Sequence, residues 1–196
     1  MYDSYARNPY RHGHGILHRR PPALGGRIPL TNMPVPNIHI RKAGLKDTSR
    51  LCLLIHDSHQ DVAERFGLTF KNCPRHPSNC TREWIEKDLV RGVVYYIMEH
   101  DDTPVGCAAI EQASPDVCYL ERLSVLPEQR EKGFGRALVN NVIIKAKTLG
   151  AGQVDIGIIA QHTELKRWYA RIGFIEGETK EFPHLPFRVT FMSYKL

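Results

Sequence analysis

A strand that passes into a helix through a basic, glycine-containing turn most constrains the fold of this chain. Residues 118–126 form the expected strand, and residues 138–149 carry apolar side chains around much of the expected helix. The turn between them holds two glycines and three basic side chains: Gly133, Gly135, Arg130, Lys132 and Arg136. The first N–H groups of a helix lack partners and carry partial positive charge, and glycines let the backbone approach an anion. The turn therefore predicts a pyrophosphate site.

Strict alternation along this strand predicts two faces. One face would carry Tyr119, Glu121, Leu123 and Val125. The other would carry Cys118, Leu120, Arg122, Ser124 and Leu126.

Two other phosphate-binding motifs do not fit. A P-loop needs Lys-Ser or Lys-Thr after two glycines separated by four residues, and no such string occurs. A dinucleotide fingerprint needs a third glycine where this chain has Leu138, although Asp155 lies near the expected ribose-binding distance. Too few residues follow Gly133 for the rest of a doubly wound nucleotide domain.

The turn resembles motif A of the GNAT family, the acyl-CoA-dependent N-acyltransferases. The family's pattern is Q/R-x-x-G-x-G/A, and this chain reads Arg130-Glu-Lys-Gly133-Phe-Gly135. Further along, Trp168-Tyr169-Ala-Arg-Ile-Gly173-Phe174 resembles the segment that carries the family's leaving-group tyrosine. The resemblance covers most of residues 37–196. It implies an α/β fold in which helices flank a mixed, mostly antiparallel sheet, as an α/β/α sandwich.

The resemblance implies acetyl-CoA, or a near relative, as cosubstrate. The backbone of Leu123 and Val125 would pair with the pantetheine amides, and N–H groups there would meet the oxyanion of the intermediate. His162 stands where the family often has an asparagine that binds the pantetheine arm, and an imidazole can replace it. The expected cofactor-binding residues are Leu123, Ser124, Val125, Arg130, Glu131, Lys132, Gly133, Phe134, Gly135, Arg136 and His162.

The implied reaction is acyl transfer from a thioester to an amine, by direct attack in a ternary complex. An alkyl amine is protonated at neutral pH, so a base must accept its proton. Glu121 is the candidate base, and the alternative is a structural glutamate paired with a basic neighbour. Tyr169 is the candidate proton donor to the thiolate, and the alternative is ordinary core packing. A noncatalytic CoA-binding sensor or adaptor on the same fold is the competing function.

The first 36 residues differ in composition from the remainder. They carry a net charge of +4 out of +6 for the whole chain, and they are rich in proline, glycine and histidine. We expect a disordered basic arm over 1–36 and one domain over 37–196. A solvated tail is the simplest interpretation of the arm, and contact with nucleic acid and a transit peptide are less favoured alternatives.

The number of cysteines and the hydropathy of the chain indicate its cellular compartment. Five cysteines, an odd number, without an apolar signal segment favour reduced thiols and a cytoplasmic protein. Apolar runs such as 93–98 are too short to cross a bilayer.

The acceptor is the least constrained part of the site. Its expected rim comprises residues 56–66, 73–80 and 176–186, where Glu176, Glu178 and Glu181 would favour a cationic amine if they converge. Cys73, His76 and Cys80 do not have usual zinc-ligand spacing, so we expect no metal and interpret the segment as a loop over the acceptor side. A small molecule or a protein could supply the amine, and a homodimer is left open.

The apolar periodicity and turn residues predict the elements. The expected strands are 38–42, 93–99, 105–111, 153–159, 174–178 and 187–194, besides the motif strand. The expected helices begin after Asp47, at Gln60, after the cap Thr81 and at Thr163, besides the motif helix.

Overall fold

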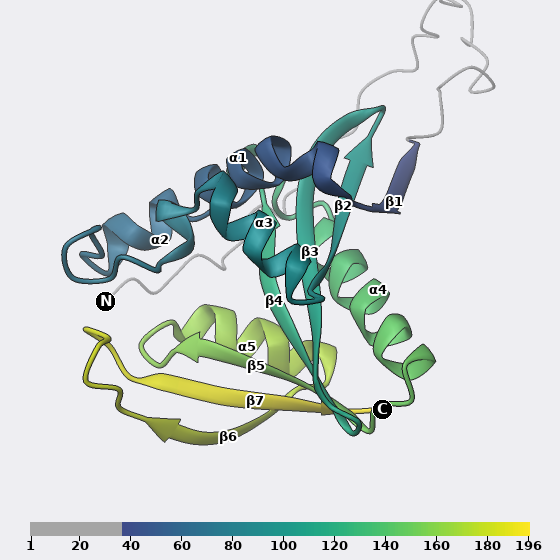
Figure 1. Ribbon diagram of the computed structural model, residues 1–196. Helices are drawn as coiled ribbons and strands as arrows, with labels where there is room; N and C mark the ends of the chain where they lie inside the picture. Colours follow the sequence, from purple (N-terminus) through teal and green to yellow (C-terminus); the bar gives the residue numbers. More distant parts are fainter. Residues whose placement is uncertain (1–36) are drawn as a thin grey trace, which may run out of the picture. The chain divides into compact units, whose positions relative to one another are not determined.

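A computed structural model describes residues 37–196 (Figure 1). The predictions for the arm, residues 1–36, lie outside the described residues. Within the described part of the chain, no helix is both long and apolar enough to cross a membrane.

Seven strands form a single sheet in the order β1-β2-β3-β4-β5-β7-β6. They are β1 (Ile38–Lys42), β2 (Val94–His100), β3 (Thr103–Ser114), β4 (Val117–Val125), β5 (Gln153–Ile159), β6 (Ile175–Lys180) and β7 (Val189–Lys195). Every neighbouring pair is antiparallel except β4 and β5, which are parallel. The prediction of a mixed, mostly antiparallel sheet is confirmed.

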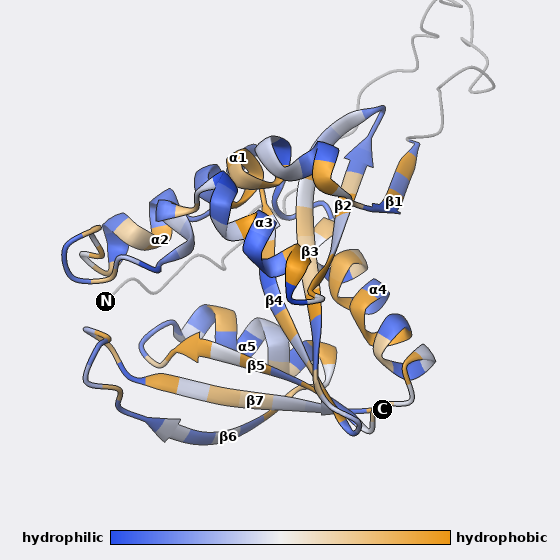
Figure 2. Cartoon of the chain, viewed as in Figure 1, coloured by the Kyte–Doolittle hydropathy of each residue, from blue (hydrophilic) through white to orange (hydrophobic). Residues whose placement is uncertain are grey.

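Helices cover both faces of this sheet (Figure 1). They are α1 (Thr48–Ser58), α2 (Gln60–Arg65), α3 (Arg82–Val90), α4 (Phe134–Thr148) and α5 (Thr163–Ile172), with short 3₁₀ turns η2 (Leu45–Asp47), η3 (Pro77–Asn79) and η4 (Pro127–Gln129). Side chains that alternate along β3 contribute to two hydrophobic cores, one on each face of the sheet. Cys107 and Ala109 pack with α1 and α3, whereas Ala108 and Ile110 pack with α4. Figure 2 shows the apolar residues that run along β3 and α4.

Strands β4 and β5 separate partway along their length. They pair only from Val117 to Tyr119 on β4 and from Gln153 to Asp155 on β5. Beyond these residues, the facing edges of the two strands are not hydrogen-bonded to each other. The sheet therefore opens beside the turn that leads into α4.

Strand β4 does not alternate strictly, so the predicted faces are wrong after Glu121. Arg122 has a φ of +52°, and the register with β3 shifts between Cys107 and Ala109. Such a bulge adds one residue and reverses the facing of those that follow. Leu123 and Val125 consequently pack with the core on the α4 side instead of sharing the face of Glu121.

Several predicted boundaries agree with the structure, including 38–42, 153–159 and 163–172. Asp47 does precede α1, but its carboxylate does not cap that helix. It accepts hydrogen bonds from Arg41 at 2.8 Å and from the N–H of Gly44 at 3.0 Å. The Arg41 guanidinium lowers the pKa of Asp47, so the carboxylate is charged at neutral pH. Through its bonds to Arg41 and Gly44, this carboxylate anchors β1 to the turn η2.

Candidate functional site

A cleft of about 1410 Å³ occupies the opening between β4 and β5. Its walls come from Leu123 and Val125 of β4, residues 157–159 of β5, the turn before α4, and α5. Helix α2 and the loop around His76 close the other side. The cleft thus joins the two sequence blocks that carry the family resemblance.

The turn before α4 presents a helix N-terminus without a side-chain cap. Gly133 is the N-cap and has a φ of +84°, a conformation that glycine adopts without a steric penalty. The first turn of α4 contains no acidic residue. The N–H groups there remain available to an anion, which fits a diphosphate group.

The Arg130 side chain binds protein groups on both sides of the turn. Its Nε donates to the carbonyl of Val125 at 3.3 Å, and Nη2 donates to the carbonyl of Ser58 at 2.8 Å. The same guanidinium forms an ion pair with Asp61 and lowers the pKa of that carboxyl. Arg130 therefore clamps the α1–α2 segment to β4.

Replacing Arg130 by methionine should destabilise the protein by about 1–3 kcal/mol. The half-exposed ion pair with Asp61 contributes little, but two carbonyls lose a charged donor. Urea denaturation measures the change. Lys132→Met is the matched control, because Lys132 contacts only Gln129 and should leave stability within about 0.5 kcal/mol of wild type. Equal midpoints for both variants would show that the clamp contributes nothing.

The other predicted cofactor residues divide into two groups. The side chains or backbone of Leu123, Val125, Arg130, Glu131, Gly133, Gly135, Arg136 and His162 line the cleft. Ser124, Lys132 and Phe134 do not. Phe134 is buried in the core, where its ring lies 5.3 Å from that of His100, and the Ser124 hydroxyl donates to the carbonyl of Arg122 at 3.0 Å.

His162 is the N-cap of α5. Its Nδ1 accepts a hydrogen bond from the N–H of Leu165 at 3.4 Å, and its ring lies 5.6 Å from that of Phe66. Burial lowers the pKa of His162, which favours the neutral ring. The imidazole thus caps α5 and also lines the cleft.

Tyr169 lies behind the cleft wall. Its side chain is buried, and its ring packs edge-on against Trp168 at 4.8 Å and Phe174 at 5.2 Å. Its helix neighbours Leu165 and Trp168 line the cleft directly. No group in residues 37–196 hydrogen-bonds to its hydroxyl. Burial raises the pKa of Tyr169, so the phenol keeps its proton at neutral pH.

Glu121 lies on the opposite side of β4, facing α3. Its carboxylate is 3.9 Å from the guanidinium of Arg91, which also binds Glu111. Burial raises the pKa of Glu121, while Arg122 opposes that shift. Glu121 does not line the cleft, and its surroundings match the alternative of a glutamate with a basic neighbour.

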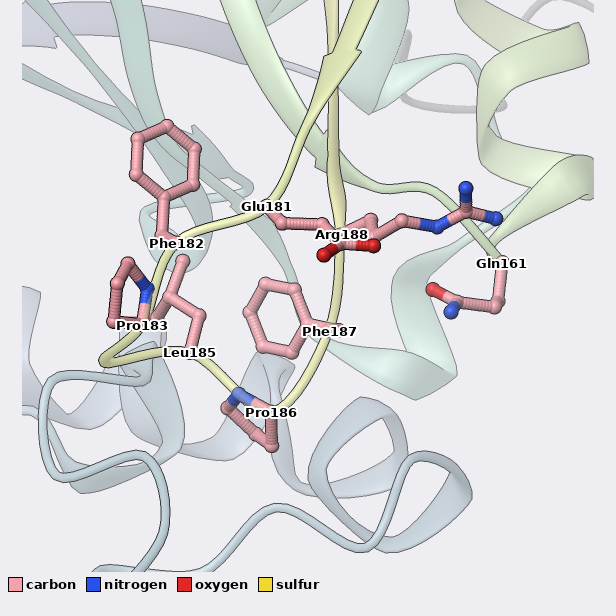
Figure 3. A pocket seen from close by; sticks show the side chains of 8 residues that line it. All are labelled: Gln161, Glu181, Phe182, Pro183, Leu185, Pro186, Phe187 and Arg188. Atoms are coloured by element: carbon pink, nitrogen blue, oxygen red, sulfur yellow. The ribbon is translucent and has the colours of Figure 1, made fainter.

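The three expected rim segments contribute unequally. Segment 56–66 contributes five residues to the cleft lining: Ser58, His59, Asp61, Val62 and Arg65. The loop 73–80 contributes His76 and Pro77. The glutamates do not converge, since Glu176 pairs with Lys166 and Glu178 pairs with Lys180. Glu181 lines a second pocket of about 440 Å³, built by Gln161 and residues 181–183 and 185–188 (Figure 3).

Cys73, His76 and Cys80 are all buried, and His76 Nδ1 lies 2.9 Å from the Ser78 hydroxyl. Residues 37–196 contain no group of three or more His, Cys, Asp or Glu side chains placed to hold a metal.

Sequence reasoning placed Ser58 and His59 within the expected acceptor rim, residues 56–66, but assigned neither a role of its own. They meet the motif turn only through Arg130, which is 72 residues from Ser58 in the chain. No local pattern signals a contact over that separation.

Comparison with known proteins agrees with this geometry. Residues 58–174 match the acetyltransferase (GNAT) family, and because this match spans more than half of the chain, the protein belongs to that family. An amino-acid acetyltransferase of Neisseria meningitidis is 30% identical over 104 residues, which are 53% of this chain and 22% of that protein. The chain therefore spans about a fifth of the length of that relative.

Two further proteins match this chain over a larger share of their own length. An uncharacterized N-acetyltransferase of Schizosaccharomyces pombe is 27% identical over 65% of this chain and 77% of that protein. The PaiA N-acetyltransferase of Thermoplasma acidophilum, solved in complex with coenzyme A, superposes with a TM-score of 0.68 over 82% of this chain and 99% of that one. At 19% identity, this likeness shows the shared fold.

Proposed function

We propose that this protein is an N-acetyltransferase that transfers acetyl from acetyl-CoA to a primary amine by direct attack in a ternary complex. The observation that carries the proposal is the uncapped N-terminus of α4 at one end of the opening between β4 and β5. A diphosphate on the N–H groups near Gly133 would direct the thioester arm along Leu123 and Val125 into this opening.

The chemistry follows from the groups around the cleft. Among the described residues, β5 pairs with β4 only as far as Tyr119, so the β4 backbone beyond it can bind the pantetheine arm and stabilise the oxyanion. Attack forms the C–N bond and breaks the C–S bond. Tyr169, which burial keeps protonated, would give its proton to the departing sulfur.

A calorimetric titration with coenzyme A, followed by a thiol-release assay with acetyl-CoA and an amine panel, tests the proposal. The panel should include amino acids, because one relative is named an amino-acid acetyltransferase, together with polyamines, lysine peptides and protein N-termini. We expect saturable binding and release of thiol with one class of amine. Binding without turnover on any class would favour a CoA-binding sensor, and absence of binding would overturn the cofactor site.

A further inference from the structure

His59 lies at the junction of α1 and α2, and its side chain lines the cleft. The preceding residue, Ser58, is bonded through its carbonyl to the Arg130 guanidinium, which also holds the carbonyl of Val125. One planar group thus ties this junction to the strand expected to hold the thioester. His59 is therefore held, through Ser58 and Arg130, in the same cleft that Leu123 and Val125 line.

Hydrogen bonding fixes the tautomer of His59. Its Nδ1 lies 2.8 Å from the carbonyl oxygen of Ile55, one of the last carbonyls of α1. A carbonyl can only accept, so Nδ1 carries the proton and Nε2 carries a lone pair. Nε2 has no hydrogen-bond partner within residues 37–196. The neutral ring therefore has an accepting nitrogen that the protein leaves unused.

The surroundings of His59 favour its neutral form. Burial lowers its pKa, and the nearby cations Arg122 and Arg130 lower it further, while the bond to Ile55 and the charge of Asp61 oppose the shift. The ring of His76 packs edge-on at 6.1 Å, and burial together with His59 lowers the pKa of His76 to about 4. Both rings are uncharged near pH 7.

A second polar group at the junction also lacks a partner. The hydroxyl of Ser58 is buried and makes no hydrogen bond within the described residues, and Ser58 lines the cleft. Burying a hydroxyl without a partner is unfavourable, because the group loses its hydrogen bonds to water. Two unused polar groups at adjacent positions indicate that a polar ligand binds at this end of the cleft.

We propose that His59 is the general base of the transfer, an inference that rests on the proposed function. Nε2 of His59 accepts one proton from the bound ammonium group, and the free amine then attacks the carbonyl carbon. Tyr169 protonates the leaving sulfur and regains a proton from the nitrogen of the intermediate. The imidazolium releases its proton to solvent, so each turnover yields one amide, one thiol and one proton.

The decisive variant is His59→Asn. The asparagine amide can still donate to Ile55, but it offers no basic nitrogen at the position of Nε2. At pH 7 we expect kcat to fall by about 10²- to 10⁴-fold, with unchanged coenzyme A affinity. The variant should then gain about tenfold in rate per pH unit as the amine, with a pKa near 10.4, loses its proton to solvent. The wild-type rate should be flat above the lowered pKa of His59.

His39→Gln is the matched control, because His39 is exposed on β1 and does not line the cleft. It should keep the wild-type rate and pH profile. Nitrogen NMR of the imidazoles gives a readout without turnover, and we expect the Nδ1–H tautomer of His59 and a pKa below 6.5.

Two outcomes separate this inference from the proposed function. If the wild type turns over an amine and His59→Asn matches its rate and pH profile, the base role fails while the acetyltransferase activity stands. An Nε2–H tautomer in the NMR spectrum also overturns the base role, whether or not the variant folds. If the wild type acetylates no amine, the proposed function fails and the base role fails with it.

Discussion

Replacing Tyr169 by phenylalanine is expected to lower kcat by about 100-fold or more, with little change in stability. The phenol is buried against Trp168 and Phe174, so the ring contacts survive the substitution. Its hydroxyl bonds to no group in residues 37–196, and burial keeps it protonated. The substitution therefore removes a proton donor without leaving a protein partner unpaired. Thiol release at saturating amine and acetyl-CoA measures the effect.

Tyr194→Phe provides the control for this experiment. Tyr194 belongs to the same aromatic cluster, with its ring 5.4 Å from that of Phe174, but it lies on β7, outside the segment 168–174 that resembles the family's tyrosine block. We expect wild-type kcat from this variant and equal coenzyme A affinity in both. If Tyr169→Phe also kept the wild-type rate, the tyrosine would be a core residue, as helical periodicity alone would suggest.

Gly106→Ala is expected to lower the free energy of unfolding by about 3 kcal/mol. A Cβ at this position on β3 would lie 2.5 Å from the backbone carbonyl oxygen of Ser124 on β4. Backbone cannot move aside as a flexible side chain can, so β3 and β4 must separate. Gly106 pairs with Val125, and this separation would also disturb the cleft wall. Urea denaturation and coenzyme A titration measure the two effects.

Gly152→Ala is the matched control for Gly106→Ala. Its added Cβ would meet the carbonyl of Asp116 at 3.7 Å, an ordinary contact distance. We expect the unfolding midpoint of this variant to stay close to that of the wild type. A Gly106→Ala protein with the same midpoint as Gly152→Ala would mean that the strands accommodate the methyl group.

Local signals in the sequence are sufficient to predict much of the fold. The helix over 163–172 ends at Gly173, which has a φ of +120°, and the strand over 153–159 follows from its apolar run. The turn into α4 is marked by Gly133, whose conformation is also left-handed. The two left-handed positions favour glycine, and the short apolar run is typical of a buried strand.

The candidate site depends more on contacts that sequence spacing does not show. Nothing in the residue type of Arg122 signals the bulge that turns Leu123 toward the α4 side, because arginine rarely adopts a positive φ. Arg130 lies in the predicted turn, but no local pattern signals that its guanidinium binds Asp61, 69 residues away. Tertiary partners of this kind decide what a charged side chain does.

The position of β6 at the end of the sheet has a consequence for solution behaviour. All of its residues are exposed, and a free strand edge is a template on which another chain can aggregate. Three of its six side chains are charged, and the register with β7 breaks between Glu176 and Thr179. Charge and distortion both discourage edge-to-edge pairing. Two of the three glutamates considered for a cationic substrate, Glu176 and Glu178, thus place charge on a strand edge and disfavour its pairing with another chain.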